Sequence, residues 1–394
     1  MRISTSLSFE RSLSYLQSTN TKLDKASEQY NSGMKFTTAA EDPTGMGNKL
    51  RFDAEISTYT QYSVNAGLAS DALGLEETAL TSIYESLSSC VVSLQSSVNG
   101  TYDEYNLDAV ATALEESLSL VFDLTNTKTS EGEYIFSGNQ SMQPTMVKTS
   151  DGTYECQADA GYRQVKVSPS VKVTTSDSGL KIFEQSPLCR TASTTGAELG
   201  YSALSTFDNF VNTNYVVGGD NTYSVAYDDA NGTYQITHGG KVVQEGEMEA
   251  GGTIIFNGLD ITLNQGVTNC DITLDPPQND NVLNTLQSLI TALRDPNLTV
   301  KERSQILAQG QVSVSNAKEN INVTLGHVGG RLKNIESVIN SNESLNVIKQ
   351  EARANISEVD VYEAASNLLK EQNALSMAQK TFSMVNGSSL FDYI

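Results

Sequence analysis

The sequence lacks the residues from which metal centres and disulfide frameworks are usually built. Its 394 residues include no tryptophan, and only His238 and His327 could supply imidazole. Four cysteines occur, with no Cys-x-x-Cys pair among them: Cys90, Cys156, Cys189 and Cys270. Structural zinc sites need closely spaced Cys and His ligands, and disulfide-rich domains need a denser set of cysteines. We therefore predict no metal site, no cofactor site and free thiols.

Basic residues and long apolar runs are also scarce. The chain has 25 Lys and Arg residues against 47 Asp and Glu residues, which gives a formal net charge of −22. A charge of this sign repels nucleic acids and anionic membranes. The opening Met1-Arg2-Ile3-Ser4-Thr5 leads into no apolar run typical of a secretory signal, and no later run is long enough to span a membrane. We predict no nucleic-acid binding, no membrane insertion and no cleaved signal peptide.

No arrangement of residues in the sequence matches an active site. Residues 328–331 (Val-Gly-Gly-Arg) lack the Gly-Lys-Ser/Thr of a phosphate-binding loop, and we interpret them as a helix kink or a close-packing point. No Gly-x-Ser-x-Gly segment accompanies a possible catalytic triad. The acid pairs at 76–77 and 115–116 are interpreted as solvated helix faces. The sequence therefore predicts a protein that is not an enzyme and has no catalytic residues.

What the sequence does contain is helical periodicity at both ends. Up to about residue 130 there is a single proline, Pro43, and apolar residues recur every three or four positions. The same spacing returns from about residue 281 to the end. Such stripes are typical of helices that pack against other helices. The stripe residues that we predict to form an assembly interface are Phe9, Leu13, Leu16, Leu23, Tyr30, Leu368, Leu375, Phe382 and Val385.

The stretch between these two helical regions is rich in glycine and has alternating apolar residues. Residues 223–227 and 234–238 alternate on either side of a polar loop, which predicts a hairpin. A second hairpin is predicted around Asn257-Gly258, the preferred sequence of a two-residue turn. The predicted fold class is therefore α+β. Long N- and C-terminal helices form a coiled-coil or helical-bundle rod, and a β-rich central domain is inserted between them.

We predict three parts in this architecture. Residues 1–42 with 360–394 are terminal paired helices that serve as an assembly core, residues 43–130 with 281–359 form a helical bundle rod, and residues 131–280 form a projecting β-rich domain. An isolated terminal helix is marginally stable in water, since fixing its backbone costs about 1–2 kcal/mol per residue. The terminal helices should therefore be labile in the monomer and become ordered when they pair inside an assembly.

Short motifs near both ends resemble those of bacterial flagellin and its hook-associated relatives. Residues 30–35 (Tyr-Asn-Ser-Gly-Met-Lys) and 40–45 (Ala-Glu-Asp-Pro-Thr-Gly) are similar to the family's Ser-Gly-Lys and Asp-Asp-Pro-Ala-Gly segment. Residues 331–332 (Arg-Leu), 355–360 (Asn-Ile-Ser-Glu-Val-Asp) and 372–375 (Gln-Asn-Ala-Leu) match the family's C-terminal pattern. The first segment, which we expect to be a loop or hinge, contains the matching residues Ser32, Gly33, Asp42, Pro43 and Gly45. Its departures are modest, because Met34 interrupts the Ser-Gly-Lys and Glu41 replaces the first Asp.

Two further segments favour the hook-associated junction type over flagellin itself. Residues 133–138 (Glu-Tyr-Ile-Phe-Ser-Gly) are similar to a segment that closes the N-terminal helical part of junction proteins. Residues 388–394 (Ser-Ser-Leu-Phe-Asp-Tyr-Ile) look like the C-terminus of those proteins. The resemblance implies a structural subunit of the bacterial flagellum, in a ring between the proximal hook-associated protein and the flagellin filament. It also implies export through the flagellar type III apparatus, with a chaperone and without a cleaved signal peptide.

Two alternatives stay open at this point. Flagellin, the bulk filament subunit, shares the helical ends and differs mainly in copy number and neighbours. A secreted adhesin or binding module would place its function in the β-rich middle instead. The family resemblance covers about residues 1–140 and 280–394, so the middle contributes nothing to this choice.

Overall fold

The computed structural model describes residues 2–97, 104–248 and 252–391, and the side chains of residues 2–6, 104 and 385–391 lie outside that description. The chain divides into two compact units. The first consists of Met1–Ala66, Val167–Pro169 and Ser337–Ile394, and the second of Gly67–Lys166 and Ser170–Glu336. Two long helices, α2 (Pro43–Ser97) and α6 (Val300–Ser357), contribute to both units.

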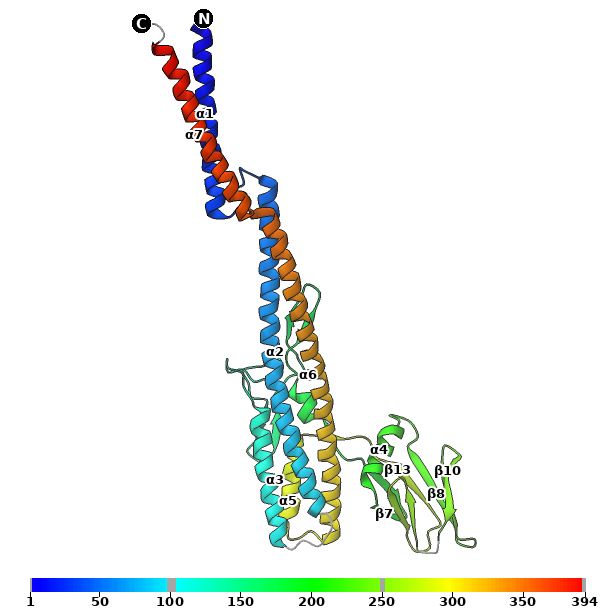
Figure 1. The fold of residues 1–394 in the computed structure, drawn as a ribbon. Coiled ribbons are helices and arrows are strands. Elements are labelled where there is room, and N and C mark those ends of the chain that lie inside the picture. The colour runs from blue at the N-terminus through cyan, green and yellow to red at the C-terminus, as the bar shows by residue number, and fades with distance from the viewer. Residues whose placement is uncertain (1, 98–103, 249–251, 392–394) are drawn as a thin grey trace. The chain divides into compact units, whose positions relative to one another are not determined.

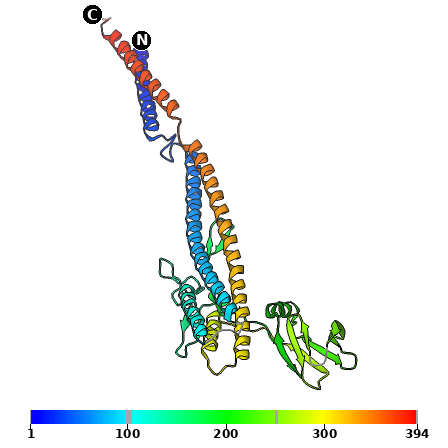
Figure 2. The same ribbon diagram turned by 60° about the horizontal axis from the view of Figure 1, so that its bottom comes forward.

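In the first unit, the two terminal helices pack against each other. Helices α1 (Arg2–Ser32) and α7 (Val361–Phe391) lie side by side, with the two chain ends at the same end of the pair (Figures 1 and 2). The two helices are therefore antiparallel. Asp360 begins α7 as an N-cap, since its Oδ1 accepts a hydrogen bond from the backbone N–H of Tyr362 at 2.8 Å. We refer to these two helices as the α1/α7 pair.

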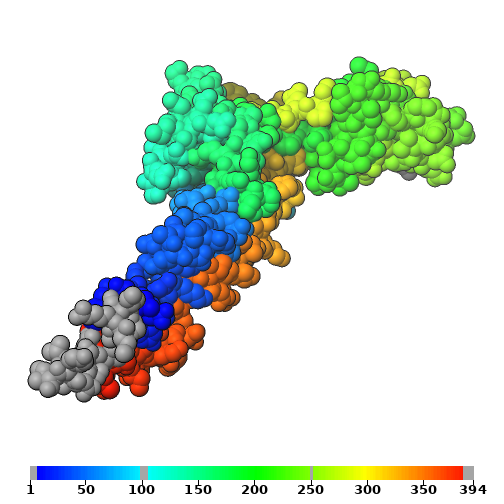
Figure 3. Space-filling view, turned by 90° about the horizontal axis from the view of Figure 1, so that it is seen from above, coloured from blue at the N-terminus to red at the C-terminus, as the bar shows by residue number. Residues whose placement is uncertain are grey.

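The first unit also contains the start of α2 and the end of α6. Their surfaces lie against each other in the space-filling view, α2 in blue and α6 in orange (Figure 3). Arg353 of α6 forms an ion pair with Asp53 of α2 at 3.3 Å, and Lys349 forms one with Glu55 at 2.7 Å. Charged contacts of this partly exposed kind contribute little stability individually, but they fix which faces of the two helices meet.

In the second unit, parts of α2 and α6 form a helical bundle with α3 (Glu104–Thr125) and α5 (Val282–Arg294). On α2 the buried leucines are spaced by seven, as a helix that packs along its whole length requires. These are Leu73, Leu80, Leu87 and Leu94. Asn281 caps α5 by accepting a hydrogen bond from the backbone N–H of Leu283 at 2.8 Å. Arg294, at the end of α5, binds Asp108 and Glu115 of α3.

Short strands connect the bundle helices. They form three two-stranded antiparallel sheets, β1–β2, β3–β4 and β5–β14. Their bounds are β1 (Met146–Lys148), β2 (Tyr154–Cys156), β3 (Gln164–Lys166), β4 (Lys172–Thr174), β5 (Ser186–Pro187) and β14 (Asn279–Asp280). A single π-helical turn, η1 (Leu180–Glu184), follows β4 and buries Ile182 and Phe183.

Residues 192–274 form a separate set of strands in the second unit, which we call the β module. A five-stranded antiparallel sheet has the order β10-β9-β8-β13-β6, and a three-stranded sheet has the order β11-β12-β7. The bounds are β6 (Ala192–Thr195), β7 (Ala197–Tyr201), α4 (Leu204–Asn214), β8 (Thr222–Asp228), β9 (Thr233–His238), β10 (Lys241–Glu247), β11 (Thr253–Phe256), β12 (Leu259–Leu263) and β13 (Asn269–Leu274). Alternate strand residues such as Val225, Ile236 and Ile261 share one core with Phe207 of α4.

The predicted α+β fold class is confirmed, with helical ends around a β-rich middle. Strands β8 and β9 pair around residues 229–232, and β11 pairs with β12 around Asn257-Gly258. Asn257 has φ +50° and Gly258 has φ +86°, as the mirror-image hairpin turn requires. His238 lies in β9, where its ring stacks on Tyr223 with centroids 4.4 Å apart.

Two local interpretations of the sequence are partly wrong. Helix α6 continues through Gly329 and Gly330, and a Cβ at either position would meet no atom of the described residues within 4 Å. These glycines are therefore not a close-packing point among the described residues, and the alternative that they kink the helix stays a prediction. In the acid pair at 76–77, Glu77 is exposed as predicted, but Glu76 is only 1% exposed and is not part of a solvated face. The partner that covers it, the segment around Asp177, is distant in sequence.

Within the described residues, no helix is apolar over enough of its length to cross a membrane. The same residues contain no group of three or more His, Cys, Asp or Glu side chains that could hold a metal ion. All four cysteines are free, and Cys90 and Cys270 are buried.

Candidate assembly interface

Where α1 and α7 pack against each other, small residues are buried at spacings of seven or fourteen positions. Thr19 and Ala26 of α1 are buried, as are Ala364 and Ala378 of α7. The Thr19 hydroxyl donates a hydrogen bond to the carbonyl of Tyr15 at 2.9 Å, so its burial leaves no polar group unpaired. Small side chains on the contact line let two antiparallel helices approach closely.

Larger residues flank this line of small residues on both helices. The rings of Phe9 and Phe382 contact each other with centroids 5.5 Å apart. Four other predicted stripe residues of the pair are half-buried: Leu16, Leu23, Leu368 and Leu375. The predicted stripe contains these large residues and not the small ones. Thr19 and Ala26 each follow a stripe leucine by three positions, which is the second spacing of a heptad and the signal that points to them.

Other predicted stripe residues stay exposed after the two helices have paired. Phe9 is 43% exposed, Leu13 is 38% exposed and Tyr30 is 44% exposed. The side chain of Val385 lies outside the described residues, as do the side chains of 388–394. The assignment of the stripe to assembly therefore stays a prediction. What the structure adds is that pairing of α1 with α7 leaves part of the stripe uncovered.

The uncovered part of the stripe belongs to a larger apolar surface on the α1/α7 pair. Its further exposed large side chains are Leu7, Tyr15, Val361, Tyr362, Leu369, Met377 and Met384. Soluble monomers rarely keep so many large apolar side chains in contact with water on two adjacent helices. This surface is therefore a candidate for contact with other chains.

A tight corner follows α1 and is fastened to the end of α6. Gly33 has φ +69°, the left-handed conformation that terminates helices, and its N–H donates to the carbonyl of Gln29 at 2.9 Å. Ser32 Oγ accepts a hydrogen bond from the backbone N–H of Met34 at 3.2 Å. Lys35 binds two carbonyls of α6, those of Ser357 and Asn355, through its backbone N–H and its ammonium group. The Ser-Gly-Met-Lys motif is thus a helix stop and an anchor.

The second half of this motif begins α2 rather than extending the loop. Asp42 is the N-cap, and its Oδ1 accepts hydrogen bonds from the backbone N–H groups of Thr44 at 3.1 Å and Gly45 at 2.8 Å. Pro43 occupies the first helical position, where its fixed φ fits and its missing N–H is not needed. A Cβ on Gly45 would lie 2.3 Å from Asp42 Oδ2 and 2.7 Å from Phe36. Pro43 and Gly45, which the sequence predicts to lie in a loop or hinge, are therefore helical.

Removal of this cap should weaken the first unit. Asp42→Ala is expected to cost about 1 kcal/mol of unfolding free energy, because two N–H groups at the start of α2 lose their acceptor. Urea unfolding followed by circular dichroism measures the change. Asp71→Ala, an exposed position further along α2, is the control and should stay within about 0.5 kcal/mol of wild type. Equal losses in the two variants would contradict the capping role.

The segment of residues 133–138 is part of the core of the second unit. Phe136 is fully buried and meets Phe183 edge-to-face at 5.2 Å. Ser137 is also buried, and its hydroxyl donates to the carbonyl of Gln143 at 2.8 Å. Gly138 has φ +65° and packs against Asp159. This motif therefore stabilises the connection after α3, and it is not a contact surface.

Comparison with known proteins places the N-terminal helices in a family. Residues 3–141 match the model of the bacterial flagellin N-terminal helical region. The chain carries a flagellin N-terminal helical region. This region includes α1, α2, α3 and the motif around Phe136. The resemblance to bacterial flagellin and its hook-associated relatives is thereby confirmed.

Two curated relatives of this chain are both named flagellar hook-associated protein 3. This chain is 25% identical over 138 residues to flagellar hook-associated protein 3 of Salmonella typhimurium. The match covers 35% of this chain and 44% of that protein. This chain is 22% identical over 184 residues to flagellar hook-associated protein 3 of Escherichia coli, which covers 47% of this chain and 57% of that protein. The matched region thus spans about half the length of these curated relatives.

Solved structures share the fold over a larger part of this chain. Flagellar hook-associated protein 3 of Legionella pneumophila superposes with a TM-score of 0.60 at 20% identity, over 77% of this chain and 98% of the other. Xanthomonas campestris FlgL superposes with a TM-score of 0.57 at 19% identity, over 77% of this chain and 99% of the other. At these identities the likeness shows the fold alone.

Proposed function

We propose that this protein is a structural subunit of the bacterial flagellum that forms a ring between the hook and the flagellin filament. The observation that supports the proposal most directly is the α1/α7 pair, whose apolar surface stays exposed in the single chain. Similarity to flagellar hook-associated protein 3 in both sequence and fold supports the position at the junction. The protein acts through packing of helices and is not an enzyme.

The α1/α7 pair supplies the assembly core in this proposal, residues 1–42 with 360–394. Apolar side chains such as Leu13, Tyr15 and Met377 become buried against neighbouring copies, and burial of each such side chain stabilises the ring by about 1.5–3 kcal/mol. Residues 43–130 with 281–359 form the rod, and residues 131–280 project from it. The other partners are the proximal hook-associated protein on one side and flagellin on the other.

Export precedes this assembly in the proposal. The chain leaves the cell through the flagellar type III apparatus, without a cleaved signal peptide, and a chaperone covers its apolar helices in the cytoplasm. A helical pair with a narrow contact line of small residues unfolds more easily than a broad apolar core, which suits passage through a narrow channel. The mature protein is extracellular, at the hook–filament junction.

Labelling of intact flagella tests the proposed position. Immunogold labelling with an antibody against the β module should give a single band where the hook meets the filament. Label along the whole filament would make the protein a flagellin. Label on the cell surface away from flagella would favour an adhesin and would overturn the proposal.

The terminal helices should exchange their amide hydrogens quickly in the monomer. Residues 7–32 and 361–384 contact mainly each other, whereas the part of α2 around Leu80 is buried in the bundle. Hydrogen exchange measured by mass spectrometry should therefore show much lower protection in both terminal helices than in residues 73–94. Equal protection in the three segments would contradict the proposed coupling of folding to assembly.

A further inference from the structure

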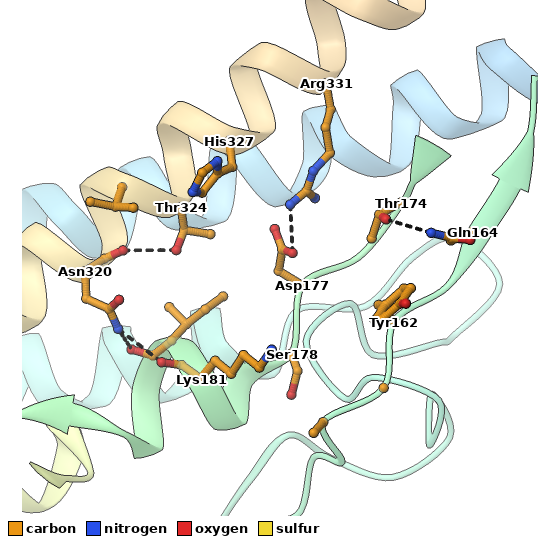
Figure 4. A pocket seen from close by; sticks show the side chains of 14 residues that line it. Tyr162, Gln164, Thr174, Asp177, Ser178, Lys181, Asn320, Thr324, His327 and Arg331 are labelled. Atoms are coloured by element: carbon orange, nitrogen blue, oxygen red, sulfur yellow. Dashed lines mark hydrogen bonds and ion pairs between the residues drawn. The ribbon is translucent and has the colours of Figure 1, made fainter. Parts of the chain in front are cut away.

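A cavity of about 570 Å³ lies in the second unit, between α6 and the segments around β3, β4 and η1 (Figure 4). One face of α6 forms one wall, because residues 320, 324, 327 and 331 are spaced by one helical turn. The opposite wall consists of Tyr162, Gln164, Thr174, Asp177, Ser178 and Lys181. The lining also includes the apolar Ala160, Ile182 and Val323, and its charged and hydrogen-bonding side chains can bind a polar ligand.

The cavity contains polar groups without hydrogen-bond partners among the described residues, the acceptor Asp177 Oδ2 as well as a donor of Arg331. The guanidinium of Arg331 uses Nη2 to bind Asp177 Oδ1 at 2.9 Å, while its Nη1 is buried with no hydrogen-bond partner among the described residues. The ammonium group of Lys181 has neither a carboxylate nor a carbonyl partner in the described part of the chain. The imidazole of His327, which is exposed on the α6 wall, also has no carboxylate or carbonyl partner among the described residues. Buried donors without acceptors are rare in native proteins, so the Arg331 group requires an explanation.

The charge of the cavity is opposite to that of the chain. Its lining has two permanent cations, Lys181 and Arg331, against the single carboxylate of Asp177. Glu76 lies behind Asp177 and accepts a hydrogen bond from its backbone N–H at 3.1 Å. Burial, and then the charge of Asp177, raise the pKa of Glu76 to about 8, so that at neutral pH this carboxyl is protonated and adds no negative charge. The site is thus a local cationic pocket on a chain with a net charge of −22.

We propose that this cavity receives a carboxylate side chain from a neighbouring copy of the same chain. The inference rests on the proposed function, which places identical copies side by side in a ring. A carboxylate fits the donors present, since Arg and Lys form charge-assisted hydrogen bonds with it, and Thr174 and Gln164 can bind its second oxygen. The Nη1 of Arg331 and the ammonium group of Lys181, which have no hydrogen-bond partner among the described residues, thereby gain an acceptor.

Two physical arguments favour a second copy as the source of the carboxylate. A ring is built from head-to-tail contacts, in which a pocket on one copy meets a different surface on the next. Each copy also carries a charge of −22, so that neighbours repel one another within the screening distance of about 8 Å unless cations offset their carboxylates. Lys181 and Arg331 are the lysine and arginine side chains of the cavity lining, so they are the groups that can offset a carboxylate there.

Zero-length carbodiimide cross-linking of isolated flagella tests the contact. This reagent joins an ammonium group to a carboxylate only where the two already touch. The expected result is a covalent dimer on a denaturing gel, in which mass spectrometry finds the Lys181 side chain bonded to an Asp or Glu of a second copy. Lys181→Arg retains the charge but lacks the reactive amine, so it should assemble normally and lose the dimer. Lys241→Gln, at an exposed lysine of β10, is the matched control and should retain it.

The outcomes separate this inference from the proposed function. Lys181→Glu should lower the amount of assembled protein about tenfold, because it places like charges opposite each other. Rings that assemble but show no Lys181 cross-link between copies would overturn the inference alone, as would a cross-link of Lys181 to its own chain or to flagellin. Loss of the immunogold band at the junction in the unmodified protein would instead overturn the proposed function.

Discussion

Phe382→Asp is expected to abolish incorporation of the protein into flagella and, with it, swimming. Phe382 contacts Phe9 across the α1/α7 pair at 5.5 Å, and both residues lie beside the small residues on which the helices close. Phe382 is half-buried, so a carboxylate there loses part of its hydration and also loses the ring contact with Phe9, and both effects oppose pairing of the helices. Without the pair, the proposed apolar assembly surface does not form.

Two measurements separate failed assembly from failed folding. Swimming in soft agar and immunogold labelling report assembly, while circular dichroism and limited proteolysis of the purified variant report whether the second unit is still folded. Gln379→Asp introduces the same charge on the same helix at an exposed position and should assemble nearly as wild type. Normal assembly of Phe382→Asp would disprove the role that we assign to the C-terminal stripe.

Glu76→Gln is expected to change how stability depends on pH. The pKa of Glu76 is raised to about 8 by burial and by the neighbouring Asp177, compared with 4.5 for an exposed carboxyl. Between these two pH values the unfolded chain has released the proton and the folded chain has kept it. The contribution of this group is therefore fully present below pH 4.5 and is lost as the pH rises towards 8. The amide side chain of the variant cannot ionise and would keep the same hydrogen bond from Asp177.

Urea unfolding of wild type and variant at pH 5 and pH 8 measures this effect. The stability of Glu76→Gln relative to wild type should increase by roughly 2–4 kcal/mol between the two pH values. Glu77→Gln removes the exposed neighbouring carboxylate, and its stability relative to wild type should change far less between pH 5 and pH 8. A parallel pH dependence of wild type and Glu76→Gln would show that the Glu76 carboxyl is ionised in the folded protein.

The same buried carboxyl links stability to the proposed contact between copies. Glu76, Asp177 and Arg331 come from three segments of the second unit and meet at the back of the cavity. While Glu76 is protonated, Arg331 faces only one charged carboxylate and retains a free donor for a ligand. Glu76→Gln fixes this state at all pH values, so it should leave the Lys181 cross-link intact.

Local chemistry explains what could be predicted from the sequence. Helical periodicity and the scarcity of proline identified the terminal helices, since both depend on neighbours three and four positions apart. Asn257-Gly258 predicted its hairpin because few other residues adopt positive φ at both central positions. The motif around Gly33 and Asp42 was found by resemblance, and the helix stop and the cap explain why those residue types occur there.

By itself, the sequence determined the helices at both ends, the strands between them and the family to which the N-terminal region belongs, because these depend on patterns within short segments. Only the tertiary structure decided that the α1/α7 pair closes on Thr19 and Ala26, that Glu76 is buried and that Lys181 and Arg331 share a cavity. Each of these features depends on residues far apart in the chain. Burial and charge pairing of a side chain are determined by what packs on top of it, and periodicity along one segment contains no information about that partner.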